Sequence, residues 1–209
     1  AYKPNLAFYE CYGIDGMRAL DATVDYIRSR YPEIFLIADA KRGDIGNTAK
    51  MYAKAFFEEM DFDAVTIAPY MGADSVTPFL EYKDKWAIVL ALTSNASAYQ
   101  FQTAVKDGKP LYRAVMEEMM EISTPDNMMF VVGATKADKL EELRSFCPDN
   151  FFLVPGVGAQ GGSAEEVMAH GANDHGGLLI NSSRGILFAS NGEDYAEAAG
   201  EVAARTAAL

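Results

Sequence analysis

Short apolar runs alternate with longer amphipathic stretches along the whole chain. The runs end in polar or Gly-rich turns. The stretches place apolar residues at i, i+3 and i+4, which predicts strands followed by helices. We expect strands at residues 2–8 (the weakest of them), 34–38, 64–68, 87–92, 128–132, 151–154 and 177–180. We expect helices at residues 16–31, 47–60, 74–82, 111–123, 136–146, 163–170 and 194–208.

This alternation amounts to seven strand–helix units and predicts a parallel sheet covered by helices. Such a sheet is either open and doubly wound or closed as a (β/α)8 TIM barrel. No GxGxxG follows the first strand, and polar motifs follow several strands from first to last, which favours the barrel. A barrel has eight units and roughly 250 residues. We therefore predict one α/β barrel domain over residues 1–209, with seven of the eight units present and the N-terminal end incomplete.

Composition and charge exclude several classes of binding partner. The 209 residues carry a formal net charge of −12, which disfavours a nucleic-acid-binding face and requires any phosphate site to be built locally. Cys11 and Cys147 are too few for a disulfide framework or a CxxC metal site. No apolar run approaches about 18 residues, and no signal peptide is recognisable. We expect a soluble, cytoplasmic protein with no membrane partner.

The strongest local signal is the sequence DAKRGDI, which starts at Asp39 directly after an apolar strand. Residues i and i+2 of a strand share a face, so Asp39 and Lys41 are expected to point the same way, toward the mouth of a barrel. Opposite charges about 4 Å apart attract by about 4 kcal/mol at an effective dielectric near 20. Asp44 lies beyond the strand and would have to return through the turn at Gly43 or reach a neighbouring chain. A purely structural ion pair at a strand end is an equally good reading of this stretch.

Two motifs follow the last two strands. Residues 155–163 (PGVGAQGGS) are rich in glycines that let backbone N–H groups approach an anion, and Ser163 can cap the next helix. Residues 181–185 (NSSRG) contain Arg184, whose guanidinium suits a pair of phosphate oxygens. Loops after strands seven and eight of a barrel often hold phosphate. We predict a phosphate site there, although each motif alone is typical of an ordinary turn.

Other polar residues are weaker signals. Lys3 follows the first strand and becomes a candidate only through its place at a strand end. The LTSN sequence that contains Ser94 offers hydroxyl and amide groups for a polar heterocycle, but such sequences are more often turns. No His, Cys and carboxylate cluster has metal-ligand spacing, so we expect no metal site.

These motifs together resemble the orotidine 5′-monophosphate decarboxylase family. DAKRGDIGNT is similar to its D-x-K-x-x-D-I-x-x-T signature, and KPNLAFYE, ALTSN, VPGVGAQGG and NSSRG occur in the order of a bacterial branch. The resemblance covers the whole chain. It implies a TIM barrel that converts orotidine 5′-monophosphate to uridine 5′-monophosphate without a cofactor, in pyrimidine nucleotide synthesis. The family's first strand carries an Asp that helps to hold the ribose, and no such strand precedes Lys3 here.

The resemblance also implies a role for each motif residue. Lys41 would protonate C6 of the pyrimidine, Asp39 would sit beside the substrate carboxylate, and Lys3 would touch the ribose and hold Asp39. A homodimer is implied, in which the partner subunit supplies Asp44, Ile45 and Thr48. The remaining contacts to the nucleotide monophosphate would be Ser94 at the pyrimidine amide edge, Pro155 near the base, and Gln160 and Arg184 at the phosphate.

Three alternatives stay open at this point. A sister sugar-phosphate decarboxylase or synthase would use a metal, with an acidic ligand where Lys3 stands. A truncated barrel would bind a nucleotide without turnover. A Schiff-base aldolase would use Lys41, but the adjacent Asp39 disfavours it, because a carboxylate stabilises the charged ammonium whereas a Schiff-base lysine reacts as the neutral amine.

Overall fold

The structure is a computed structural model that describes residues 1–133, 137–156 and 163–208. Contacts group the chain into two compact units, hereafter unit 1 (Ala1–Ala91 and Thr103–Phe130) and unit 2 (Leu92–Gln102 and Val131–Leu209). Parallel strands alternate with helices in both, as the sequence predicts. The strand order in the main sheet is β1-β2-β3-β6-β7-β8.

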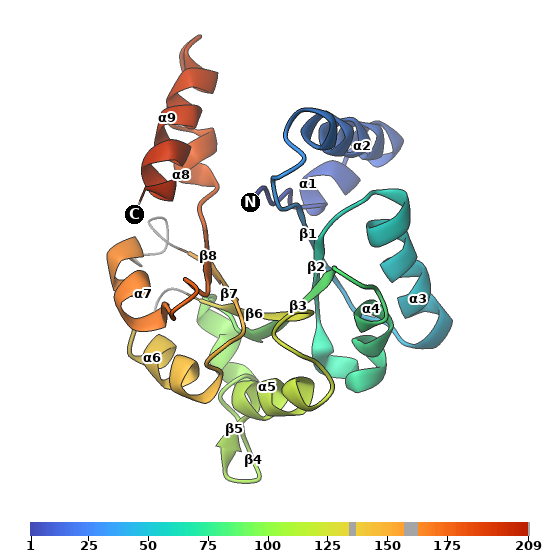
Figure 1. Ribbon diagram of the computed structural model, residues 1–209, viewed down its shortest axis with the longest axis vertical. Helices are drawn as coiled ribbons and strands as arrows, with labels where there is room; N and C mark the ends of the chain where they lie inside the picture. The colour runs from blue at the N-terminus through green and yellow to red at the C-terminus, as the bar shows by residue number, and fades with distance from the viewer. Residues whose placement is uncertain (134–136, 157–162, 209) are drawn as a thin grey trace. The chain divides into compact units, whose positions relative to one another are not determined.

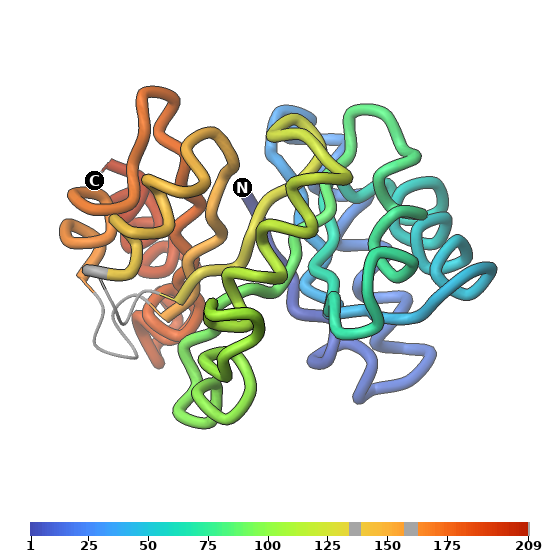
Figure 2. Tube along the Cα trace, turned by 90° about the horizontal axis from the view of Figure 1, so that it is seen from below, coloured from blue at the N-terminus to red at the C-terminus, as the bar shows by residue number. Residues whose placement is uncertain are grey.

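Unit 1 contains the first strands and their helices (Figure 1). β1 pairs in parallel with β2, and β2 with β3. A small antiparallel hairpin, β4–β5, lies against α5, as Figure 2 also shows. The elements of this unit are α1 (Ala7–Glu10), α2 (Gly13–Arg30), β1 (Ile37–Arg42), α3 (Gly46–Lys54), the π-helical turn η1 (Ala55–Glu59), β2 (Ala64–Ile67), η2 (Pro69–Met71), η3 (Ala73–Ser75), α4 (Thr77–Leu80), β3 (Trp86–Leu92), β4 (Val105–Lys106), β5 (Lys109–Pro110), α5 (Leu111–Glu121) and the start of β6 (Met128–Val132).

Unit 2 repeats the pattern. β7 pairs in parallel with β8, α6 packs on α7, and α8 packs on α9 (Figure 1). Its elements are η4 (Ala96–Gln100), the end of β6, α6 (Ala137–Phe146), β7 (Phe152–Pro155), α7 (Ala164–Gly171), β8 (Leu178–Asn181), α8 (Arg184–Leu187) and α9 (Tyr195–Ala207). None of the helices in the described ranges is both long and apolar enough to cross a membrane.

The amphipathic pattern explains why these helices form where they do. In α2 the buried residues Leu20, Val24 and Ile27 recur at helical spacing, so one face of the helix is covered. All four residues of β2 and all five of β6 are buried, as expected for parallel strands covered on both faces. Ser163 caps α7 as predicted, because its Oγ accepts a hydrogen bond from the Glu166 N–H at 3.3 Å.

Two strand predictions need correction. The strand expected at 2–8 is not formed. The segment makes only isolated bridges, Tyr2 with Leu36 just before β1 and Asn5 with Asp39 in β1, and α1 begins at Ala7. Pro4 has no N–H to continue a ladder, although its carbonyl accepts from the Asp39 N–H at 3.1 Å. The strand expected at 34–38 is β1, which begins at Ile37 and runs on through the DAKR sequence.

Candidate active site

The site in unit 1 is a row of three alternating charges. Lys3 Nζ lies 2.5 Å from Asp39 Oδ2, and Lys41 Nζ forms an ion pair with Asp39 Oδ1. One carboxylate therefore serves two ammonium groups, and the trio has a net charge of +1. The expected ion pair between Asp39 and Lys41 is present, and Lys3 joins it from the segment that runs beside β1.

Burial differs sharply within this trio. The side chains of Asp39 and Lys3 are 8% and 12% exposed, whereas that of Lys41 is 50% exposed. Burial alone would raise the pKa of Asp39, but the charge of Lys3 and the hydrogen bonds from Lys3 and Lys41 outweigh it, so the pKa lies below its usual value. Asp39 is thus held ionised, and Lys41 is the most exposed member of the trio.

Strand alternation is not what brings Lys41 to Asp39. The Lys41 backbone is left-handed, with φ at 47°, a conformation that non-glycine residues rarely adopt. The register also breaks here, because β1 advances from Ala38 to Arg42 while β2 advances only from Val65 to Ile67. A bulge in β1 therefore re-aims the lysine side chain, as bulges next to active sites often do.

Thr66 is a site residue that the sequence reading missed. It is 1% exposed, lies opposite the bulge in β2, and accepts the Lys41 N–H at 2.9 Å through its hydroxyl. The same hydroxyl is 3.2 Å from Asp39 Oδ1. The available signal was a lone hydroxyl in the apolar run AVTIA, since a buried polar group requires partners.

Arg42 supports the end of β1. It forms an ion pair with Glu10, donates to the Ala40 carbonyl at 2.8 Å, and stacks over the rings of Tyr52 and Phe56 at 5.5 Å each. These contacts connect β1 to α1 and α3. Arg42, the third charged residue of the DAKRGD motif, therefore has a structural role.

Asp44, Ile45 and Thr48 lie past this strand end and do not join the trio within the described chain. Asp44 Oδ1 accepts the Ile45 N–H at 2.7 Å and makes no described ion pair. Ile45 is 47% exposed and Thr48 is also exposed. The return of Asp44 through the turn at Gly43 is therefore not observed in this single chain.

The expected nucleotide-binding residues of unit 2 are placed in part. Ser94 follows β3 and packs closely on Gly133. A Cβ atom added to Gly133 would lie only 2.9 Å from atoms of Ser94. Its neighbour Thr93 is fixed by Gln102, which accepts from the Thr93 N–H at 2.8 Å and donates to the Thr93 hydroxyl at 2.7 Å. Pro155 ends β7 and Arg184 begins α8 with an exposed side chain. Gln160 lies outside the described residues.

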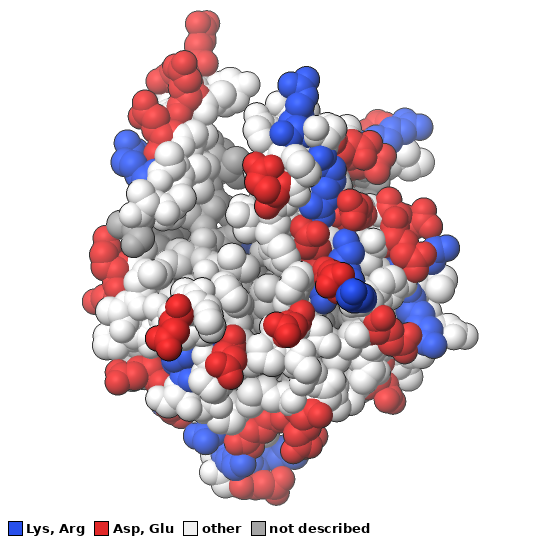
Figure 3. Space-filling view, in the orientation of Figure 1, with Lys and Arg blue, Asp and Glu red and all other residues white. Residues whose placement is uncertain are grey.

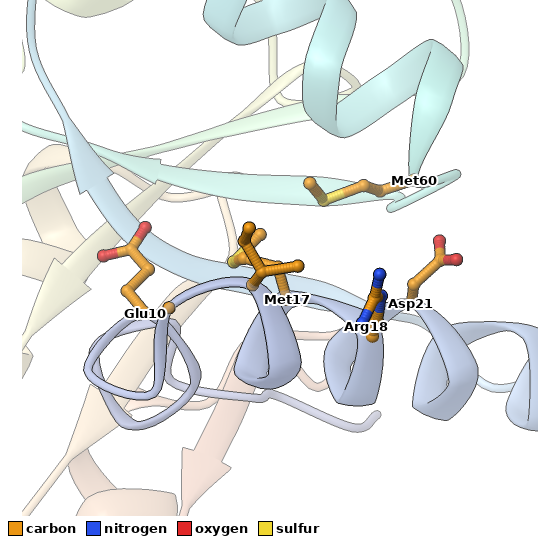
Figure 4. A pocket seen from close by; sticks show the side chains of 7 residues that line it. Glu10, Met17, Arg18, Asp21 and Met60 are labelled. Carbon is orange, nitrogen blue, oxygen red and sulfur yellow. The ribbon is translucent and has the colours of Figure 1, made fainter.

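A separate pocket of about 540 Å³ lies in unit 1 between the start of α2 and Met60 (Figure 4). It contains none of the predicted site residues. Met60 faces α2 residues such as Met17 across it, and the lining residues are Glu10, Gly13, Ile14, Met17, Arg18, Asp21 and Met60.

Comparison with known proteins identifies the relatives of this chain. Residues 1–199 match the family described as orotidine 5′-phosphate decarboxylase / HUMPS. The orotidine 5′-phosphate decarboxylase of Christiangramia forsetii is 58% identical over 200 residues, which are 96% of this chain and 74% of that protein. That of Phocaeicola vulgatus is 54% identical over 209 residues, 100% of this chain and 77% of that protein.

A solved structure agrees. Leishmania donovani OMP decarboxylase superposes with a TM-score of 0.85 at 38% identity, covering 100% of this chain and 80% of that one. The barrel fold expected from the alternation of strands and helices is thereby confirmed. The charged trio at β1, the sequence match over nearly the whole chain and the structural similarity agree: this chain belongs to the orotidine 5′-phosphate decarboxylase family.

Proposed function

We propose that this chain decarboxylates orotidine 5′-monophosphate to uridine 5′-monophosphate, with Lys41 as the acid that protonates C6. The observation that carries the proposal is the trio Lys3–Asp39–Lys41 at the end of β1 in a chain of this family. The reaction class is a carboxy-lyase step in pyrimidine nucleotide synthesis. We place it in the cytoplasm.

The chemistry needs a charge partner for a carbanion. The bond between C6 and the carboxylate breaks, its electron pair stays on C6, and carbon dioxide leaves. A proton then moves from the Lys41 ammonium to C6, which leaves the amine neutral until solvent reprotonates it. A fixed ammonium stabilises the negative charge as it develops, so the step requires no electron sink from a cofactor.

The geometry of the trio suits this step. Lys3 and Asp39 are mostly covered and form an ion pair, and the half-exposed Lys41 has the most open surface for the reacting carbon. The net charge of +1 gives an anionic ligand a local attraction on a chain whose formal charge is −12. Figure 3 shows Lys and Arg side chains next to Asp and Glu side chains, with no large area of positive charge among the described residues on this face. The attraction for an anionic substrate must therefore come from a few cations at the site.

We assign the rest of the nucleotide to the remaining motif residues. Lys3 contacts the ribose, Ser94 the pyrimidine amide edge and Pro155 the base, while Gln160 and Arg184 bind the phosphate. The assignment of Arg184 to the phosphate has this support: its side chain is exposed at the start of α8 and makes no described ion pair. Its guanidinium is therefore available to bind a phosphate dianion.

Replacing Arg184 by Ala tests the phosphate assignment. A charged hydrogen-bonded pair contributes about 1.5–3 kcal/mol, so kcat/KM for orotidine 5′-monophosphate should fall by about 10- to 150-fold. Steady-state kinetics measure it, with Arg205→Ala on α9 as a control for the loss of an exposed arginine. An unchanged kcat/KM in Arg184→Ala removes the residue from phosphate binding.

We further propose that the working form is a homodimer in which Asp44, Ile45 and Thr48 reach the partner's site. The support is the apolar surface around them. Ile45 is 47% exposed, and Met51 on α3 is 60% exposed. Tyr70 and Met71 are 93% and 53% exposed on η2, and η2 and α3 both contact η3. Large exposed apolar side chains at one place are typical of an interaction surface.

The decisive experiment is an ultraviolet assay of orotidine 5′-monophosphate loss with a chelator present. Wild-type turnover is expected, and Lys41→Ala should lose at least about 10³-fold in kcat, because it removes both the acid and the charge that stabilises C6. Calorimetry should show that Lys41→Ala still binds uridine 5′-monophosphate.

Each other result has a meaning. Turnover that stops with chelator indicates a metal-dependent sister enzyme. Binding of the product without wild-type turnover indicates an inactive nucleotide-binding barrel. Full turnover in Lys41→Ala excludes that lysine from the mechanism.

A further inference from the structure

A single buried hydroxyl replaces part of the backbone ladder beside the charged trio. Between Ala38 and Arg42 the pairing of β1 with β2 is interrupted, and Thr66 is the β2 residue opposite the gap. Regular bonding resumes where the Ala68 N–H donates to the Arg42 carbonyl at 2.8 Å. Within the gap, the Lys41 N–H donates to Thr66 Oγ1 at 2.9 Å. The hydroxyl therefore satisfies a backbone donor that the bulge would otherwise leave unpaired.

The same hydroxyl reaches the carboxylate. Its hydrogen can point to Asp39 Oδ1 at 3.2 Å or to the Ala38 carbonyl at 3.5 Å, and the shorter contact is to the ionised oxygen. Asp39 Oδ1 is also the oxygen that pairs with Lys41, while Oδ2 pairs with Lys3. Thr66 thus contacts Lys41 at its backbone and, through Asp39, at its ammonium.

We propose that Thr66 is a positioning residue for the reaction, one that fixes the left-handed backbone of Lys41 and the carboxylate that holds the lysine's ammonium. The inference rests on the proposed function of Lys41. Thr66 is 1% exposed, so it acts through its two neighbours and not by touching substrate. Because it orients the acid, its loss should slow proton delivery and leave nucleotide binding intact.

The test compares Thr66→Val, which keeps the shape and loses the hydroxyl, with Thr66→Ser, which keeps the hydroxyl. In single-turnover decarboxylation we expect Thr66→Val to be slower by about 10- to 100-fold, the range for one hydrogen bond to a charged group. KM for orotidine 5′-monophosphate and the affinity for uridine 5′-monophosphate should stay within about twofold of wild type. Thr66→Ser should recover most of the rate.

Two controls separate positioning from general damage. Ser123→Ala also removes a partly buried hydroxyl, which lies just after α5 and contacts the Met119 carbonyl at 2.7 Å and Met128 Sδ at 3.3 Å. The rate of this variant should be unchanged. Thr66→Ala removes the Thr66 hydroxyl with less steric demand, so the comparison does not depend on one variant folding. The single-turnover rate of each variant is divided by the fraction of its molecules that bind uridine 5′-monophosphate, so that misfolded protein does not count as slow protein.

The outcomes are distinct. A wild-type rate in both Thr66→Val and Thr66→Ala overturns the proposal while leaving the decarboxylase function intact. Equal losses in Thr66→Ser and Thr66→Val overturn it as well, because the hydroxyl is then not the cause. A wild-type chain without turnover refutes the proposed function itself.

Discussion

At the scale of the residue, Asp39 carries more of the site than any other side chain described. Its two oxygens hold two ammonium groups, and a buried hydroxyl lies beside one of those oxygens. The arrangement explains how an acidic chain keeps two lysines together, because the carboxylate between them offsets their repulsion.

The stability contributed by Asp39 should depend on pH in one direction. Its folded pKa lies below the value of about 3.9 for an unfolded Asp, so its contribution is present above about pH 4 and is lost as the pH falls through the folded pKa. Asp39→Asn should therefore unfold about 2 kcal/mol more easily at pH 7, with the difference from wild type shrinking toward acid. Urea titrations at neutral and acid pH measure this.

Asp15→Asn is the matched control, because Asp15 pairs with Arg18 at 3.2 Å with both side chains exposed. Such a pair contributes little, so the control should track wild type at both pH values. A gap between wild type and Asp39→Asn that widens in acid would contradict the sign derived for Asp39.

At the scale of the element, Arg144 joins the ends of several elements of unit 2. Its guanidinium donates to carbonyls at 2.8–3.1 Å and lies 4.0 Å from the Phe152 ring, while burial lowers its pKa despite the opposing influence of Cys147 and Asp149. The accepting carbonyls belong to Cys147, Pro148, Asn150, Gly171 and Gly177. They connect the end of α6 to the end of α7 and to the segments that lead into β7 and β8.

Arg144→Lys should destabilise the protein by about 2–3 kcal/mol even though the charge is kept, since a lysine cannot reproduce the planar fork and leaves several carbonyls without donors. The free energy of unfolding in urea measures the loss. Arg205→Lys, at an exposed pair 3.8 Å from Glu201, should change it by less than about 0.5 kcal/mol. Equal effects of the two substitutions would mean that Arg144 acts as a charge alone.

The elements also show what the sequence can and cannot predict. Strong periodicity located β6 at its observed bounds and α2, α5 and α9 within a few residues. The β4–β5 hairpin was missed because Val105–Pro110 has no alternation to reveal it. β1 was placed too early because the Leu36 N–H bonds the Asp63 carboxylate at 2.7 Å, a long-range contact that no local pattern encodes.

The candidate site was likewise predicted only in part from the sequence. Lys3, Asp39 and Lys41 were found through motif and strand-end position, and the structure brings them together. The bulge and Thr66 were not found, because a register break depends on the partner strand. Strand alternation correctly predicted that Lys41 pairs with Asp39, but for the wrong reason. The left-handed backbone of Lys41, not regular alternation, brings the two side chains together.

At the scale of the whole molecule, the proposed dimer should be sensitive to charge on its apolar surface. A stable interface buries about 1,200–2,000 Å² in total and excludes unpaired charge from its centre. Met51→Asp, at an α3 side chain that is 60% exposed, should therefore shift the protein to monomer and lower its activity at high dilution. Sedimentation velocity and dilution assays measure both.

Val105→Asp provides the comparison, since Val105 is 74% exposed on the hairpin and lies outside the proposed interface. It should leave both the mass and the activity unchanged. A wild-type protein that is monomeric at micromolar concentration and fully active would rule out sharing of Asp44, Ile45 and Thr48 between subunits.

The left-handed backbone at Lys41 has a consequence for sequence design. A sequence chosen only to fit this backbone would place glycine or asparagine at position 41, because the strain of a left-handed lysine costs about 1–2 kcal/mol. Neither residue carries an amine, so stability and turnover make opposite demands at one position. A redesign that scored only stability would therefore favour replacing the proposed acid, so position 41 must be held fixed in such a redesign.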